Sequence, residues 1–268
     1  MKTCLAFSGA GAKVIYESGN ALAWQQSGLQ YDAVIGTSSG AITAAFLHAG
    51  QVEELVDVCL KVRNKDIYSL APWKLMTKDA CVLDNAPLRK LLKSRLDTGK
   101  LRMNPKKCIV NATDTRTWKA KSFELSKLSP DAIIDAIVAS TSVPVAFPRR
   151  NGLIDGGTVD NYPIMDAVTD QVDRIILFTP SMVEPIEVKN ALGALNEFIS
   201  ITLYSQMLNQ LRAMAALKSH VELVVIQPQQ PVNIGLLDFS AIPSIAIRRE
   251  VIDAARRQAL ARLKLCRV

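Results

Sequence analysis

Gly36-Thr37-Ser38-Ser39-Gly40 is the most informative stretch of this 268-residue chain. An apolar run from Tyr31 to Ile35 precedes it, and a helix-forming run from Ala41 to Ala49 follows. The stretch fits G-x-S-x-G, in which a sharp strand-to-helix turn lifts a serine hydroxyl out of a sheet and glycines avoid clashes within the turn. It therefore predicts a nucleophile at Ser38, with an ordinary strand-to-helix turn as the alternative.

Strand-like and helix-like patterns alternate on both sides of this stretch, which is typical of an α/β fold with a mainly parallel sheet. The other expected elements are a strand at 3–8, a helix to about residue 27, buried strands at 108–112, 174–178 and 221–226, and a last helix at 243–265. Between Asn190 and Ser219, apolar side chains spaced three or four apart predict a long amphipathic helix. No repeat or linker divides the chain, so we expect one domain over residues 1–268.

The composition, 49% hydrophobic and 21% charged, is that of a globular protein and excludes disordered, collagen-like and coiled-coil chains. No apolar stretch approaches the roughly 18 residues that cross a bilayer, and the N-terminal apolar run already ends at Gly9. Five cysteines without a Cys-x-x-Cys pair, and only two histidines, indicate neither a disulfide framework nor a metal site. We expect a cytoplasmic chain without metal or cofactor.

The net charge of +7 comes from one basic segment, Lys61 to Lys107, which holds thirteen Lys and Arg against four Asp. The remainder has 19 positive and 21 negative residues (32 − 13 and 25 − 4). Such an excess predicts a surface that meets phosphate, as in anionic lipid headgroups, although a merely solvated face is the alternative. Nucleic acid is not expected, because few aromatic residues beyond Tyr68 and Trp73 accompany the charges.

Within this segment, residues 70–84 mix Trp73, Leu75 and Met76 with lysines and show little periodicity. One interpretation is a mobile cap that touches lipid. The other, which we prefer at this point, is a connection whose apolar residues pack on the core.

A nucleophilic serine needs a base, and neither histidine is well placed to be one. His48 lies ten residues beyond Ser38 in the same expected helix, about 15 Å away, and is explained by the preference for histidine at helix C-termini. His220 follows the long helix, which offers the same explanation. Chain order alone would still allow a triad of Ser38, Asp155 and His220.

Two further loops contain residues suited to a catalytic or binding role. In the segment 152–157, Asp155 follows a short apolar strand and precedes Gly156 and Gly157, so another side chain can approach its carboxylate closely, although an ordinary turn has the same composition. In the segment 8–13, small residues before a helix leave backbone N–H groups that can hold an oxyanion or a phosphate. It is not a nucleotide motif, because G-x-G-x-x-G requires glycine at position 14, where Val14 stands.

Together the three loops resemble the patatin-like phospholipases over most of the first 165 residues. The similar segments are 7–13 (glycine-rich loop), 36–40 (nucleophile elbow), 155–157 (Asp-Gly-Gly box) and the flanking 139–148 and 159–163. The chain departs from the family pattern in having Ala10 as the middle residue of the glycine-rich loop, and Lys13-Val14 where Arg-Gly is usual. The Ala10 N–H is retained, whereas Lys13 lacks the planar fork of arginine.

The resemblance implies a patatin-like three-layer α/β sandwich and a lipid acyl hydrolase of phospholipase A type with a Ser38–Asp155 dyad. The implied oxyanion hole is formed by Gly9, Ala10 and Gly11, and the motif glycines are Gly36, Gly40, Gly156 and Gly157. The expected partners are a phospholipid or other lipid ester and a membrane surface, which the protein would meet peripherally. The alternatives are a soluble Ser-Asp-His carboxylesterase and a non-catalytic module that binds anionic lipid.

Overall fold

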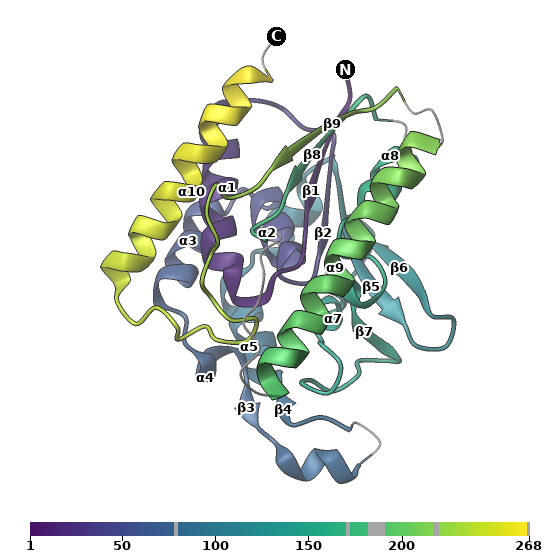
Figure 1. The fold of residues 1–268 in the computed structure, drawn as a ribbon, viewed down its shortest axis with the longest axis vertical. Coiled ribbons are helices and arrows are strands. Elements are labelled where there is room, and N and C mark those ends of the chain that lie inside the picture. The colour runs from purple at the N-terminus through teal and green to yellow at the C-terminus, as the bar shows by residue number, and fades with distance from the viewer. Residues whose placement is uncertain (78–79, 170–171, 182–190, 217–219, 267–268) are drawn as a thin grey trace.

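Seven strands form one mixed sheet at the centre of the molecule (Figure 1). The computed structural model describes residues 1–77, 80–169, 172–181, 191–216 and 220–266. The strands of this sheet are β1 (Thr3–Phe7), β2 (Ala33–Thr37), β5 (Lys107–Asp114), β6 (Lys119–Glu124), β7 (Leu153–Asp155), β8 (Arg174–Phe178) and β9 (Glu222–Ile226). Their order is β6-β5-β2-β1-β8-β9, with β7 also paired to β5. Only β6 and β7 run antiparallel to their neighbour, so the expected mainly parallel sheet is confirmed.

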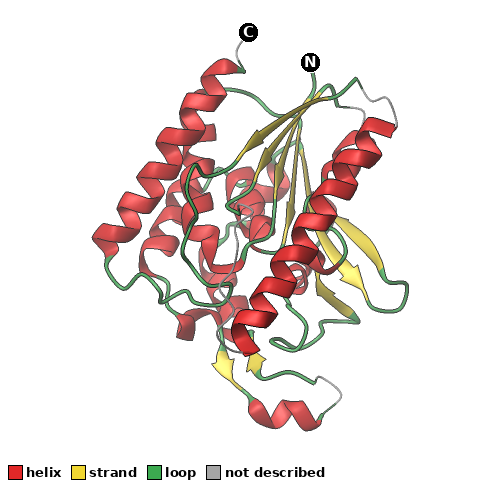
Figure 2. Cartoon of the chain, viewed as in Figure 1, coloured by secondary structure: helices red, strands yellow, loops and turns green. Residues whose placement is uncertain are grey.

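Helices cover both faces of the sheet (Figure 2). The described α-helices are α1 (Val14–Ser27), α2 (Ser39–His48), α3 (Val52–Lys61), α4 (Asn64–Ile67), α5 (Ala86–Arg95), α6 (Thr98–Met103), α7 (Pro130–Ser140), α8 (Ile164–Thr169), α9 (Ala191–Ala216) and α10 (Ile245–Leu265). Because side chains alternate along a strand, Leu5 and Phe7 of β1 pack with α1, α2 and α3, whereas Cys4 and Ala6 pack with α8 and α9. The chain is therefore a three-layer α/β sandwich, as expected.

The long helix expected between Asn190 and Ser219 is α9, and its ends at residues 190 and 217–219 lie outside the described residues. One face of α9 packs on the sheet through a row of half-buried side chains: Leu203, Met207, Leu211 and Met214. Phe198, Ile201 and Tyr204, outside this row, are exposed. Of the helices described, none combines the length and the apolar character needed to cross a membrane.

Residues 69–84, which we call the finger, leave the body of the molecule at its lower end in Figure 1. They form the antiparallel pair β3 (Ser69–Leu70) and β4 (Leu83–Asp84), with the 3-10 helix η2 (Pro72–Met76) between them; residues 78–79 lie outside the described part. Leu70, Trp73, Leu75 and Met76 are exposed. The expectation that the finger's apolar residues pack on the core is wrong for these four, because the β3–β4 pair carries them beyond it.

Acidic side chains from neighbouring helices offset part of the basic segment's charge. Among the ion pairs that cross its boundaries are Lys61–Asp57, Arg89–Asp135, Lys93–Asp131 and Arg95–Glu54. These partners lie in or beside α3 and α7, outside residues 61–107, so a charge count along the chain does not register them. The excess seen in the sequence is therefore not an unpaired surface charge of the same size.

Candidate active site

Ser38 occupies a strained turn between β2 and α2, with φ 54° and ψ −125°. A positive φ is unusual for a residue with a side chain and costs about 1–3 kcal/mol, so the surrounding structure must enforce it. The flanking glycines make the turn possible: a Cβ at Gly36 would lie 2.3 Å from the Gly40 carbonyl oxygen, and one at Gly40 would lie 2.3 Å from the Phe7 carbonyl oxygen. The sharp strand-to-helix turn predicted from the sequence is confirmed.

Asp155 meets Ser38 across the edge of the sheet. Strand β7 pairs Asp155 with Ala112 of β5, and β5 is the parallel neighbour of β2. The Ser38 hydroxyl donates a 2.6 Å hydrogen bond to Asp155 Oδ2, and the Gly157 N–H donates one of 2.7 Å to Oδ1. A Cβ at Gly156 would lie 2.2 Å from the Asn111 carbonyl oxygen, so this approach requires glycine.

Burial raises the pKa of Asp155 to about 7, although the hydrogen bonds from Ser38 and the Gly157 N–H act in the opposite direction. Only 5% of the residue is exposed. A carboxylate with a pKa near neutrality is far more basic than an ordinary aspartate, and it can accept a hydroxyl proton and return it within one cycle.

The glycine-rich loop follows β1 and is held by side chains from two other parts of the chain. Asn161 accepts a 3.1 Å hydrogen bond from the Gly9 N–H and donates one of 3.0 Å to the Gly9 carbonyl oxygen. The Ala10 N–H donates to Ser39 Oγ at 2.9 Å, and the φ of Ala10, −159°, is extended backbone that suits alanine. Among the described residues, the Gly11 N–H has no hydrogen-bond acceptor. An oxyanion would therefore meet the Gly11 N–H directly and would have to displace side-chain oxygens from Gly9 and Ala10.

Sequence reasoning assigned no role to three polar residues around this site. Ser140 at the end of α7 accepts a 2.8 Å hydrogen bond from the Ser38 N–H. Gln206 of α9 donates to the Gly157 carbonyl oxygen at 3.0 Å and accepts from the Asn161 N–H at 2.9 Å. Ser140 and Asn161 lie in the flanking segments noted above, whereas nothing in the local sequence marks Gln206.

The structure brings neither histidine to Ser38. His48, the last residue of α2, is buried, its Nδ1 lies 3.1 Å from the Tyr31 hydroxyl, and burial lowers its pKa to about 4. The helix-dipole explanation for His48 is wrong, because that interaction favours a charged imidazole.

His220 lies just before β9. The first residue of β9, Glu222, pairs with Arg174 of β8, which in turn pairs with Thr3 of β1. Ser38 follows the C-terminal end of β2, whereas His220 precedes the N-terminal end of β9, which is parallel to it. The two ends of a five-residue strand are about 16 Å apart. A triad of Ser38, Asp155 and His220 is therefore not formed in this structure.

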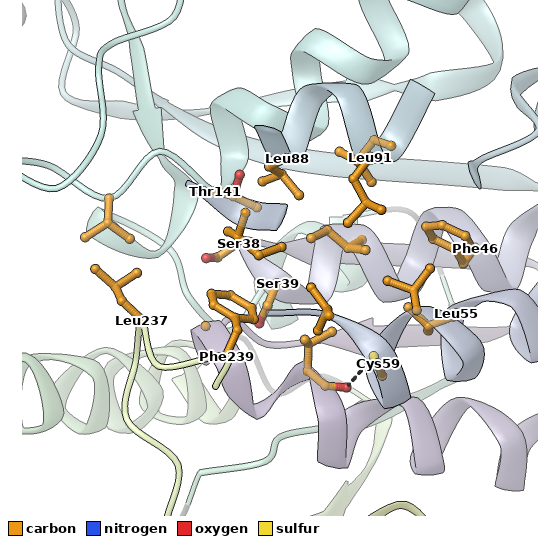
Figure 3. Close-up of a pocket in the computed structure, with 18 of the residues that line it drawn as sticks. Ser38, Ser39, Phe46, Leu55, Cys59, Leu88, Leu91, Thr141, Leu237 and Phe239 are labelled. Carbon is orange, nitrogen blue, oxygen red and sulfur yellow. Dashed lines mark hydrogen bonds between the residues drawn. The ribbon is translucent and has the colours of Figure 1, made fainter. Parts of the chain in front are cut away.

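An apolar pocket extends from Ser38 between α2, α3 and α5 (Figure 3). Ser38, Thr141 and Leu237 lie toward one side, while Phe46 and Leu55 lie toward the other. Apart from Ser38, Ser39 and Thr141, all the residues that line it are apolar or glycine. Such a lining suits the hydrocarbon part of a ligand whose polar end lies beside Ser38.

Part of the pocket wall comes from the C-terminal third of the chain. The Leu236 carbonyl oxygen accepts from the Ala12 N–H at 2.9 Å, and Leu237 and Phe239 line the pocket. The fully buried Arg248 of α10 fixes this wall by donating to the carbonyl oxygens of four residues: Cys59, Val62, Phe239 and Ile242.

No metal site is evident in the part of the chain that the structure describes, where no three His, Cys, Asp or Glu residues are grouped to hold an ion. All five cysteines are buried, and none of them forms a disulfide.

Residues 5–168 match the family of patatin-like phospholipases. The 1-acylglycerol-3-phosphate O-acyltransferase Pnpla3 of Mus musculus is 28% identical over 183 residues, which cover 62% of this chain and 41% of the mouse protein. This chain therefore spans less than half the length of that relative.

Two solved structures resemble the fold. The crystal structure of VipD from Legionella pneumophila has a TM-score of 0.52 and 16% identity, with 98% of this chain and 67% of that chain covered. For full-length ExoU with SpcU, from the type III secretion system of Pseudomonas aeruginosa, the TM-score is 0.49 and the identity 15%, with 98% and 52% covered. The likeness to VipD shows a common fold.

Proposed function

Because the chain belongs to the patatin-like phospholipase family, we propose that it is a lipid acyl hydrolase in which Ser38 and Asp155 form a catalytic dyad. The observation that carries this proposal is the 2.6 Å hydrogen bond from the Ser38 hydroxyl to Asp155 at the opening of an apolar pocket. The substrate class is a phospholipid or another lipid ester, whose acyl chain the pocket would hold.

In the proposed mechanism Ser38 Oγ attacks the ester carbonyl carbon while its proton moves to Asp155 Oδ2. The carbonyl oxygen becomes an oxyanion that the N–H groups of the glycine-rich loop stabilise, the Gly11 N–H first and those of Gly9 and Ala10 after exchange of their present bonds. Collapse of this intermediate breaks the ester bond, and Asp155 returns the proton to the departing alcohol. Water, activated by Asp155, then releases the fatty acid from Ser38.

The positive φ of Ser38 supports this role, since it aims the hydroxyl away from the sheet. The near-neutral pKa of Asp155 supports it as well, because the carboxylate has to accept a proton without a histidine. The proposal requires neither metal nor cofactor. It places the enzyme as one domain over residues 1–268, at a membrane surface in a reducing compartment such as the cytoplasm, consistent with its five cysteines outside disulfides.

The test is covalent labelling of Ser38 with a fluorophosphonate, together with fatty acid release from phospholipid and from a short-chain ester. Wild type should be labelled and active, and Ser38→Ala should lose both properties. Labelling of another serine, or turnover by folded Ser38→Ala, would contradict the proposal. Lipid binding without labelling would favour the non-catalytic module, and loss of activity in folded His220→Ala would favour the esterase triad.

The name of the mouse relative indicates a second outcome for the same acyl-enzyme, which is transfer of the acyl group to an alcohol instead of water. Adding 1-acylglycerol 3-phosphate to the assay separates the two activities. A transferase gains a diacylated product at the expense of free fatty acid, whereas a hydrolase releases fatty acid at an unchanged rate.

A further inference from the structure

The finger presents four large apolar side chains to solvent within seven residues. The exposed fractions are 74% for Leu70, 67% for Trp73, 48% for Leu75 and 93% for Met76. Clustered exposed hydrophobic residues mark surfaces that meet a partner. We propose that the finger inserts into the surface of a lipid bilayer and brings the mouth of the Ser38 pocket to it, an inference that rests on the proposed function for its substrate.

The finger is attached directly beside the pocket. The N–H groups of Val82 and Leu83 donate hydrogen bonds of 3.0 and 2.9 Å to the carbonyl oxygens of Val145 and Ala146. The neighbouring residues Val143 and Phe147 line the pocket together with Ser38. The base of the finger therefore adjoins the wall of the pocket that holds Ser38.

Other exposed apolar residues surround the same end of the site. Val145 is 68% exposed and Val159, four residues after Asp155, is 38% exposed. On α9, Phe198 is 66% exposed and precedes Gln206, which contacts the Asp-Gly-Gly box, by eight residues or about 12 Å. The N-terminal part of α9 and the finger extend toward the same end of the molecule in Figure 1.

The chemistry of the finger favours lipid over a protein partner. Its tip is a protrusion and not a groove, so its shape selects no particular protein surface, whereas a bilayer accepts it in any orientation about its axis. Over residues 69–84, Lys74 and Lys78 are balanced by Asp79 and Asp84, so the finger carries no net negative charge that an anionic membrane surface would repel. A tryptophan flanked by aliphatic side chains is typical of segments that lie at the interface between headgroups and acyl chains.

Apolar contact, not net charge, should dominate the binding energy. Lys74 of the finger is paired with Asp84, so the described tip adds little unpaired charge. Hydrophobic contacts persist when salt screens exposed charges, whose range falls to about 8 Å at physiological ionic strength. This distinguishes the finger from binding through the basic segment.

The experiment uses Ser38→Ala protein, so that binding is measured without hydrolysis, and sedimentation with vesicles of phosphatidylcholine with or without phosphatidylserine. Trp73→Ser with Met76→Ser should weaken binding by about tenfold or more. The matched control is Trp118→Ser with Met103→Ser, which removes the same residue types, 81% and 84% exposed, from other parts of the surface. The control should bind like its parent, and thermal unfolding checks that all variants are folded.

Insertion itself is read from Trp73. In a Trp118→Phe background the remaining tryptophans are Trp73 and the buried Trp24, so a blue shift of emission on adding vesicles reports Trp73. The shift should persist at high salt.

Equal vesicle binding by the finger variant and its control, or binding lost at high salt in both, overturns the proposal. These outcomes do not depend on whether the protein hydrolyses lipid. Inactivity with finger-dependent binding would refute the proposed function alone.

Discussion

Asn161 and Gly9 are joined by two reciprocal hydrogen bonds, one from the Gly9 N–H to Asn161 Oδ1 and one from the Asn161 side-chain amide to the Gly9 carbonyl oxygen. A Cβ at Gly9 would lie 2.5 Å from Asn161 Oδ1 and 2.6 Å from the Ser38 Cβ, so only glycine fits between them. The position of the glycine-rich loop relative to Ser38 thus depends on a side chain more than 150 residues away.

We therefore predict that Asn161→Asp lowers kcat by at least about tenfold while KM changes little. The carboxylate cannot donate to the Gly9 carbonyl oxygen and adds negative charge where an oxyanion would form. Asn151→Asp, the same change at an exposed residue, should stay within about twofold of wild type. Steady-state kinetics on a soluble ester decides, and an unchanged kcat for Asn161→Asp would remove its positioning role.

Asp155→Asn should lower turnover by at least about a hundredfold, because the amide has the shape of the carboxylate but cannot accept the Ser38 proton. Asp160→Asn is the matched control. Burial also raises the pKa of Asp160 to about 7, yet its carboxylate binds Gln210. Its turnover should remain within about tenfold of wild type. The reverse order of the two effects would make Asp160 the base.

The pH dependence of kcat/KM should report Asp155. Its pKa is raised to about 7, so the proton-accepting carboxylate forms as pH rises through that value. Activity should therefore increase with pH and level off above about pH 8, with a slope near one on the acidic side. A rate that is flat from about pH 5 to 8 would mean that no group with this pKa is required.

Stability should follow the opposite trend. The pKa of Asp155 is raised from 3.8 to about 7 on folding, so between these values the folded state binds more protons than the unfolded state. Its contribution to the free energy of unfolding therefore falls as pH rises through this window. Asp155→Asn should be more stable than wild type by up to about 4 kcal/mol near pH 8 and nearly equal to it near pH 4. Urea unfolding of both proteins at the two pH values tests this. If wild type and Asp155→Asn were equally stable at both, burial would not destabilise the charged carboxylate.

Neither histidine should be needed for turnover. His220→Ala and His48→Gln, the latter chosen because glutamine can still bond to Tyr31, should keep kcat/KM within about tenfold of wild type, or 1.4 kcal/mol. Because His48 is buried, thermal unfolding is used to check that the His48→Gln variant is folded. A folded but inactive His220→Ala variant would instead indicate that His220 acts as the base.

The sequence predicted the parallel strands of the sheet, the strand-to-helix turn at Ser38 and the long helix near residue 200 because these depend on local apolar patterns and glycines, but it did not predict β6. It did not predict what depends on packing between distant segments. The exposure of Trp73 follows from where the β3–β4 pair leaves the core, and the pairing of Arg95 with Glu54 brings together charges that lie apart in the chain. The bonds that Asn161 and Ser39 make with the glycine-rich loop likewise exist only after folding.

The buried guanidinium of Arg248 has a consequence for how this protein can be divided or recombined. The residues that match the family end at 168, yet Arg248 and the segment around Leu237 complete the pocket beside Ser38, and Gln206 braces the Asp-Gly-Gly box. The recognisable motif region is thus not a transplantable module. A chimera that exchanged the last hundred residues would keep Ser38 and Asp155 but have a different pocket wall, so under the proposed function its substrate preference should follow the C-terminal part of the chain.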